Sequence, residues 1–136
     1  MSIAEKLKAL NIVLPTPPAP AANYVPFVLH QNMVYISGTT ATGEDGEIVG
    51  RGNIQDQAKQ TLKNIEKALL NAGATLKDVV RTRIYVTDIT EWEKVGHVHG
   101  DIFKDIRPAT SMVEVRGLIS PEILVEIEAD AIIIDY

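Results

Sequence analysis

Residues 53–73, NIQDQAKQTLKNIEKALLNAG, and residues 79–86, VVRTRIYV, are the two stretches that decide the fold class. The first begins with Asn53 three residues before Asp56, which is a helix N-terminal signature, and it stops at Gly73. Apolar residues recur within it every three to four positions, which predicts an amphipathic helix. The second stretch alternates as a strand does, and one face is expected to carry Val80, Thr82, Ile84 and Val86. Together they predict an α+β protein.

Further elements are expected on both sides of this pair. Strands are predicted at residues 25–29, 33–37, 111–115 and 124–134, which gives the order strand, strand, helix, strand, helix, strand, strand. A capping box of Thr90 and Glu93 predicts the start of the second helix, and Pro108 bars its continuation. Its apolar stripe is expected to consist of Trp92, Val95, Val98, Ile102, Phe103 and Ile106.

The N-terminal region is expected to precede this domain and to lie on its surface. A short helix is predicted at residues 3–10, and four prolines between residues 15 and 20 stiffen the backbone into an extended arm. We therefore expect residues 1–23 to form a helix and a proline-rich arm. Residues 24–136 are expected to form a single domain.

The two predicted helices are too few to cover both faces of the predicted sheet. Two amphipathic helices can cover only one face of a sheet of this size, yet the strands carry apolar residues on both faces. Two layers are therefore expected, a sheet and two helices on one of its faces. We expect self-association to cover the other face, which would place any ligand cleft between subunits.

The composition argues against several classes of function. The chain has 136 residues, a formal net charge of −5 and no cysteine. The negative charge opposes nucleic-acid binding, because phosphates require a basic surface, and the lack of cysteine excludes disulfides and thiol chemistry. No apolar run reaches the roughly 20 residues that span a bilayer, and the first residues lack a secretory-signal pattern. A cytoplasmic protein with neither nucleic-acid nor membrane partners is expected.

A row of acidic residues is one candidate site. Glu126, Glu128 and Asp130 step by two along a predicted strand, so their side chains project from one face. Such a row is most often solvated or faces another subunit. A single carboxylate held in a cleft would instead position a water molecule or move a proton, and the spacing does not choose among the three.

Two histidines lie close together in the second predicted helix. His97 and His99 differ by two positions, which is about 200° around a helix, so they do not chelate one metal ion. His99 falls on the apolar stripe, where a half-buried histidine held by one hydrogen bond is expected, and His97 faces the polar side with Asp101. No metal site and no cofactor are expected.

Several segments share one further pattern. The chain reads NYV at residues 23–25, VYISG at residues 34–38, RPATSMVEV at residues 107–115 and VEIEADA at residues 125–131. Together with the first helix, these segments resemble, in the same order, the reactive intermediate deaminase (Rid, YjgF-like) family. The resemblance covers nearly the whole chain after the proline arm.

This resemblance implies a chorismate-mutase-like fold, with a mixed sheet and two helices on one face, and a homotrimer that binds a small metabolite at the subunit interfaces. It also implies hydrolysis of an enamine or imine without a cofactor. The family's water-orienting glutamate matches Glu126, its substrate-contacting turn matches Gly38, and its cleft tyrosine matches Tyr24. His99 falls at the position of a further cleft tyrosine, which would give it a share in substrate binding.

Thr110 departs from the family pattern. Deaminating members carry an arginine at this position that binds the substrate carboxylate, and Arg107, three residues earlier, does not replace it. A hydrogen bond to a charged group contributes about 1.5–3 kcal/mol, so its loss weakens carboxylate binding by roughly 10–150-fold. The resemblance therefore implies a subgroup without the anchoring arginine, a hydrolase of altered specificity. The alternative is a non-catalytic binding or regulatory trimer, and an endoribonuclease is the least favoured reading.

Overall fold

The computed structural model describes residues 2–11 and 25–134. Its elements in chain order are α1 (Ile3–Ala9), β1 (Phe27–His30), β2 (Met33–Thr39), α2 (Ile54–Ala72), the 3-10 helix η1 (Leu76–Asp78), β3 (Val79–Val86), the 3-10 helix η2 (Ile89–Glu91), α3 (Trp92–Phe103), β4 (Ala109–Glu114) and β5 (Val125–Ile132). The order of helices and strands after α1 is the predicted one. The proline arm lies outside the described residues.

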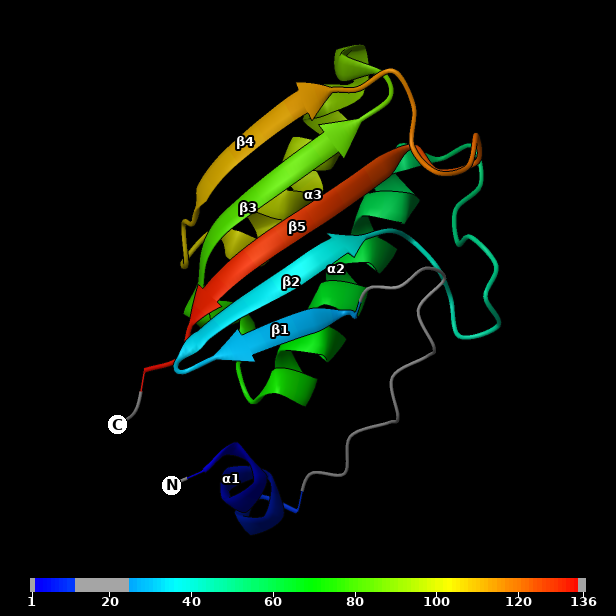
Figure 1. The fold of residues 1–136 in the computed structure, drawn as a ribbon. Helices are drawn as coiled ribbons and strands as arrows, with labels where there is room; N and C mark the ends of the chain where they lie inside the picture. Colours follow the sequence, from blue (N-terminus) through cyan, green and yellow to red (C-terminus); the bar gives the residue numbers. More distant parts are fainter. Residues whose placement is uncertain (1, 12–24, 135–136) are drawn as a thin grey trace.

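The five strands form one sheet in the order β1-β2-β5-β3-β4. The β3–β4 pair is parallel, and the other pairs are antiparallel. Helices α2 and α3 both lie behind this sheet in the view of Figure 1, so they cover the same face. The predicted α+β fold, with a mixed sheet and two helices on one face, is confirmed.

Helix α2 begins and ends where its sequence signals predict. The Asn53 side chain accepts a hydrogen bond from the Asp56 backbone N–H at 3.1 Å, and Gly73 ends the helix in the left-handed conformation at φ 85°. The apolar stripe of the helix packs on the sheet. The core between the two layers includes Leu62, Ile65 and Leu69 of α2, Val95 and Val98 of α3, and Ile84, Val125 and Ile127 of the sheet.

The expected facing of strand β3 is wrong at one residue. Val80 does not join Thr82, Ile84 and Val86 on the buried face but is 44% exposed. The reason is a shift in the pairing with β5 between Val79 and Arg81, which breaks the two-residue alternation at Val80. From Thr82 onward the alternation holds, and that residue is fully buried.

The start of α3 also differs from the prediction. Thr90 and Glu93 form no capping box; instead the Asp88 carboxylate accepts hydrogen bonds from the Thr90 backbone N–H and hydroxyl and caps η2. Because this extra turn precedes the helix, Trp92 stands at its start and is 53% exposed rather than part of the apolar stripe. The buried positions of α3 are Val95, Val98 and Phe103.

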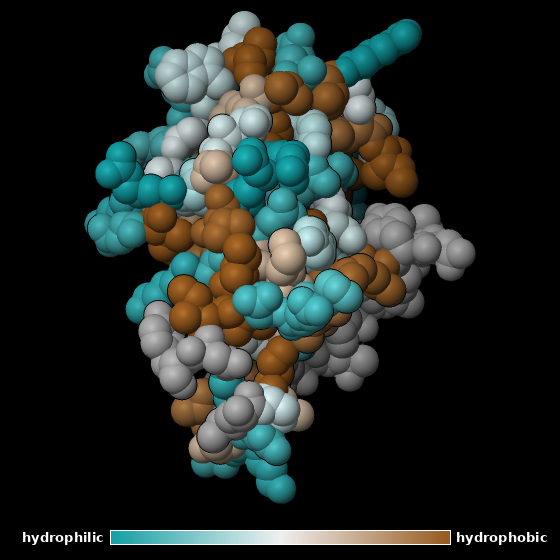
Figure 2. Space-filling model, turned by 60° about the vertical axis from the view of Figure 1, so that its left-hand side comes forward, coloured by the Kyte–Doolittle hydropathy of each residue, from teal (hydrophilic) through white to brown (hydrophobic). Residues whose placement is uncertain are grey.

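The sheet face away from α2 and α3 carries both apolar and polar side chains. Tyr35 alternates with the buried Val34 and Ile36, so it points to this face, and its cross-strand partner Val28 does so too. Both are more than 40% exposed. Figure 2 shows apolar patches reaching the surface between polar groups on the side of the molecule that it presents. No helix within the described ranges is long and apolar enough to cross a membrane.

Candidate functional site

Strands β5 and β2 bring Glu126 and Gly38 together. A Cβ atom built on Gly38 would lie 2.7 Å from the Glu126 Oε2 atom and 3.0 Å from its Cδ atom. A side chain at residue 38 would displace the Glu126 carboxyl group, which therefore lies against bare backbone at Gly38. Two residues 88 positions apart that were predicted to share a site are thus in contact.

The three carboxylates of the acidic row on β5 differ in their hydrogen-bond and ion-pair partners. Glu128 accepts a hydrogen bond from the Tyr85 hydroxyl, and Asp130 pairs with Arg83 at 3.2 Å. The Glu126 carboxylate makes no hydrogen bond and no ion pair with any residue of the described ranges. The sequence spacing did not separate the three carboxylates, whereas their contacts leave Glu126 as the one available to a ligand.

Two neighbours change the acidity of Glu126. Partial burial raises the pKa of its carboxyl group, and the negative charge of Glu128 raises it further. Both effects favour the protonated form, which brings the group closer to a proton-transfer role near neutral pH. Glu126 therefore has the exposure, the free lone pairs and the shifted acidity that a water-orienting carboxylate needs.

A second polar group lies around Thr110 on the edge strand β4. The Thr110 hydroxyl donates to the Pro108 carbonyl oxygen at 3.1 Å and lies 2.8 Å from the Thr82 hydroxyl. The Thr82 hydroxyl in turn lies 2.9 Å from His99 Nε2. Three side chains from β3, β4 and α3 therefore form one hydrogen-bonded chain that ends on a backbone carbonyl.

His99 occupies the position expected of it on α3. Its ring packs against Phe103 with ring centroids 4.6 Å apart, and it is half-buried. Burial lowers the pKa of the imidazole, which favours the neutral ring at neutral pH. On the polar side, His97 Nε2 lies 3.6 Å from the Asp101 carboxylate, so the two histidines point apart as predicted.

The two polar groups lie on opposite faces of the sheet. Thr110 is the register partner of the buried Thr82 and projects toward the helix layer at the sheet edge. Glu126 alternates with the buried Val125 and Ile127 and projects to the face away from the helices. Gly38 lies next to Glu126 on the open face, and His99 is linked to Thr110 through Thr82 on the helix face. One copy of the chain therefore presents two candidate half-sites, the Thr110 half-site and the Glu126 half-site, and does not unite them.

Some predicted residues join neither group. Tyr24 lies outside the described residues, so its place in the site stays a prediction. In the described part of the chain, no three His, Asp or Glu side chains converge to hold a metal ion. The sequence reasoning missed Thr82, although a threonine at a position that alternates with buried residues was a signal, because a buried hydroxyl requires a hydrogen-bond partner.

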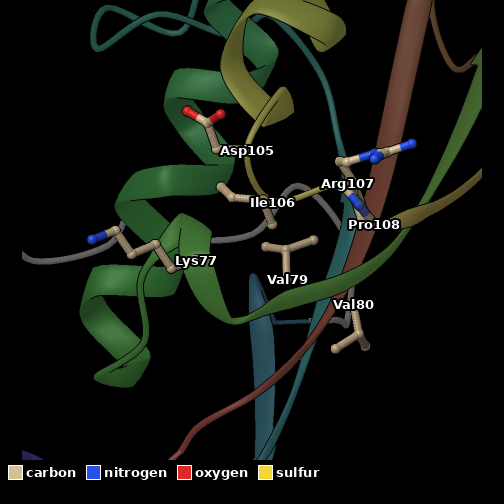
Figure 3. Close-up of a pocket in the computed structure, with 7 residues that line it drawn as sticks. All are labelled: Lys77, Val79, Val80, Asp105, Ile106, Arg107 and Pro108. Carbon is tan, nitrogen blue, oxygen red and sulfur yellow. The ribbon is translucent and has the colours of Figure 1, made fainter.

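An open groove lies next to the Thr110 half-site, at the beginnings of β3 and β4 (Figure 3). Its volume is about 550 Å³, and its walls are Lys77, Val79, Val80, Asp105, Ile106, Arg107 and Pro108. The charged ends of Lys77, Asp105 and Arg107 point in different directions in Figure 3 and do not converge on one point. Pro108, which accepts the Thr110 hydrogen bond, joins this groove to the half-site.

Known proteins share both sequence and fold with this chain. The family model described as Endoribonuclease L-PSP matches residues 15–133. The 3-aminoacrylate deaminase RutC of Acinetobacter baylyi is 38% identical over 123 residues, which are 89% of this chain and 96% of that protein. Among solved structures, Rv2704 of Mycobacterium tuberculosis, a member of the YjgF/YER057c/UK114 family, is 51% identical with a TM-score of 0.75, over 83% of this chain and 89% of that one. The E. coli YjgF gene product is 31% identical with a TM-score of 0.78, over 85% and 91%.

Proposed function

Because the chain belongs to the endoribonuclease L-PSP family, which is the YjgF or Rid family, we propose that it is a deaminase-like hydrolase of a small enamine or imine. The similarity to RutC, named as a 3-aminoacrylate deaminase, supports this reaction class. The observation that carries the proposal is the half-buried, unpaired carboxylate of Glu126 held against the backbone of Gly38.

The reaction requires one oriented water molecule and one proton carrier. The water oxygen bonds to the carbon of the C=N group while the nitrogen takes up a proton, which gives a carbinolamine. Its C–N bond then breaks, ammonia leaves with the electron pair and a proton, and a carbonyl group forms. Glu126 accepts a proton from the attacking water and returns it to the departing nitrogen, for which a raised pKa is suited.

A complete site needs a second copy of the chain. The Thr110 half-site of one copy and the Glu126 half-site of another meet when the β4 and α3 edge of one packs on the open sheet face of the next. Contacts between two different surfaces of identical chains close into a ring when the rotation between neighbouring copies is a whole fraction of a turn. A homotrimer with three interfacial sites is our proposed assembly, and the exposed Tyr35 and Val28 on the open face are consistent with such burial.

Thr110 is the proposed determinant of altered specificity. Its short hydroxyl side chain provides no positive charge for a substrate carboxylate, in contrast to the arginine expected from the family pattern. In addition, its hydroxyl is already bonded to Thr82 and Pro108. We therefore place the chain in a subgroup whose substrate is not anchored through a carboxylate.

The second candidate is a non-catalytic trimer that binds a small metabolite. The missing arginine favours it, since the same pocket without an anchor would bind ligands without positioning them for attack. RNA cleavage, the activity in the family's description, is less favoured, because the chain is acidic and its open face carries three carboxylates in a row.

A measurement of turnover distinguishes the hydrolase from the non-catalytic binding trimer. The test generates 2-aminoacrylate and uncharged imines in situ and measures ammonia release with and without the protein. The hydrolase reading expects faster decay that depends on Glu126. Stabilisation of the protein by the carbonyl products without any acceleration on the whole series would favour the binding trimer and overturn the hydrolase.

A further inference from the structure

We assign the direction of each hydrogen bond around Thr110 by counting hydrogens, starting from the contact with the Pro108 carbonyl oxygen. A hydroxyl group has one hydrogen to donate and two lone pairs that accept. Thr110 donates its hydrogen to the Pro108 carbonyl oxygen, which has none to give back. With that hydrogen directed at Pro108, the hydrogen between the two threonines comes from Thr82, and Thr110 accepts it.

Counting the threonine hydrogens also assigns the donor in the contact with His99. Since Thr82 donates its single hydrogen to Thr110, its contact with His99 Nε2 is one in which the ring N–H donates. In this assignment the histidine is the Nε2–H tautomer, and Nδ1 of the neutral ring keeps a lone pair. No described residue makes a hydrogen bond to Nδ1.

The hydrogen-bonding capacity that Thr110 has left for a ligand is that of an acceptor only. Thr110 is exposed, its hydrogen is used, and one of its two lone pairs is still free. From this we infer that the Thr110 half-site accepts hydrogen bonds and donates none, so that it selects a substrate with a neutral N–H or O–H group, such as a carboxamide, over the carboxylate analogue. This inference rests on the proposed function, because it takes Thr110 to face the substrate.

The rejection of a carboxylate has a physical cause. An ionised carboxylate only accepts hydrogen bonds, and opposite a free lone pair it loses its hydration and gains no partner. A carboxamide of the same shape places an N–H at that point. His99 and Thr82 are positioning residues in this account, because they act on the ligand through the orientation of the Thr110 hydroxyl.

Thr82 and His99 thereby also determine the specificity of the site. Replacing Thr82 with valine removes the hydroxyl in the middle of the chain while keeping the side-chain shape. The His99 Nε2–H then loses its acceptor, and a donor becomes free at the half-site. Discrimination against a carboxylate should fall in this variant even though Thr110 is unchanged.

The test compares the binding of pyruvamide and pyruvate, two product analogues that differ in the amide and carboxylate groups, by titration calorimetry on the intact protein. We expect pyruvamide to bind more tightly. Thr110→Val should weaken it by roughly 2–12-fold, the equivalent of one neutral hydrogen bond, without weakening pyruvate. Thr82→Val should reduce the preference, and Thr82→Ser, which keeps the hydroxyl, should restore it.

Either of two results overturns the inference: pyruvate binding as tightly as pyruvamide, or no measurable binding of pyruvamide. Circular dichroism of each variant checks that it is folded, and the Thr82→Ser protein gives a second comparison if the valine variant is unstable. The outcome is separate from that of the proposed function. Binding preference is measured without turnover, so a protein that prefers pyruvamide but releases no ammonia would refute the hydrolase alone.

Discussion

The Thr110 hydroxyl and the Glu126 carboxylate lie on opposite faces of one five-stranded sheet. The first belongs to a hydrogen-bonded chain with Thr82 and His99 on the helix side, and the second lies against Gly38 on the open side. If both act on one substrate, they do so from different copies of the chain.

Glu126→Gln should abolish most of the turnover. The amide keeps the size of the side chain but does not accept a proton from water, and general-base catalysis of this kind contributes about 10²–10⁴-fold. We expect kcat to fall by that factor while the affinity for the carbonyl product changes little. The matched control is Asp130→Asn on the same row, where the carboxylate is paired with Arg83. A fall as large in the control would assign the effect to the row as a whole.

Gly38→Ala should displace the Glu126 carboxylate without unfolding the protein. The new methyl group would meet the far end of a flexible side chain, which can rotate away, rather than backbone. A displacement of about 1 Å costs on the order of 10–100-fold in rate. In Glu126→Gln, the alanine substitution should have little further effect on kcat. Gly117→Ala serves as the control, since nothing lies within 4 Å of its added Cβ. If Gly38→Ala and Glu126→Gln lower kcat independently, so that their factors multiply in the double variant, then Gly38 does not act through its contact with Glu126.

Glu126→Gln should also raise the melting temperature at neutral pH. The folded-state pKa of Glu126 lies above its ordinary value, so the fold favours the protonated form. Its contribution to stability is therefore fully present below the unfolded-state pKa and is lost as the pH rises through the folded-state pKa. We expect the variant to melt slightly higher than the parent at pH 7 and equally at pH 3 to 4. Thermal scans across pH measure this, and a variant that is less stable at pH 7 would contradict the assigned pKa direction.

Thr110→Arg should convert the preference of the site toward carboxylates. A guanidinium group that reaches a carboxylate contributes about 1.5–3 kcal/mol, which corresponds to roughly 10–150-fold tighter pyruvate binding. The binding of pyruvamide should not improve in parallel. Thr110→Gln is the control for side-chain length without charge. If pyruvate binding stays unchanged in a folded arginine variant, residue 110 does not face the ligand.

Much of the fold was predictable because its signals are local. The cap at Asn53, the stop at Gly73 and the spacing between them are properties of neighbouring residues, and α2 follows them. The family prediction is confirmed as well, since its motifs are contiguous segments. In contrast, the facing of Val80 depends on how β3 pairs with β5, a strand that lies more than forty residues later. No local pattern carries that information.

The site was predictable to a smaller degree. The even spacing of the acidic row placed three carboxylates on one face but did not rank them, because Tyr85 and Arg83, which occupy two of them, come from another strand. Similarly, the contact of His99 with Thr82 joins a helix to a strand that precedes it. Side-chain partners across elements decide which groups are free, and only the folded structure supplies them.

Co-expression of two inactive variants tests the central claim most directly. One copy carries Glu126→Gln and the other carries Thr110→Trp, which fills the opposite half-site, and the mixed assemblies are purified through a different tag on each copy. If the sites form between copies of a trimer, one of the three sites in every mixed assembly combines two intact halves, and ammonia release should return toward about a third of the parent rate. Mixed assemblies that remain as inactive as either variant alone would contradict a hydrolytic site built from Thr110 of one copy and Glu126 of the next.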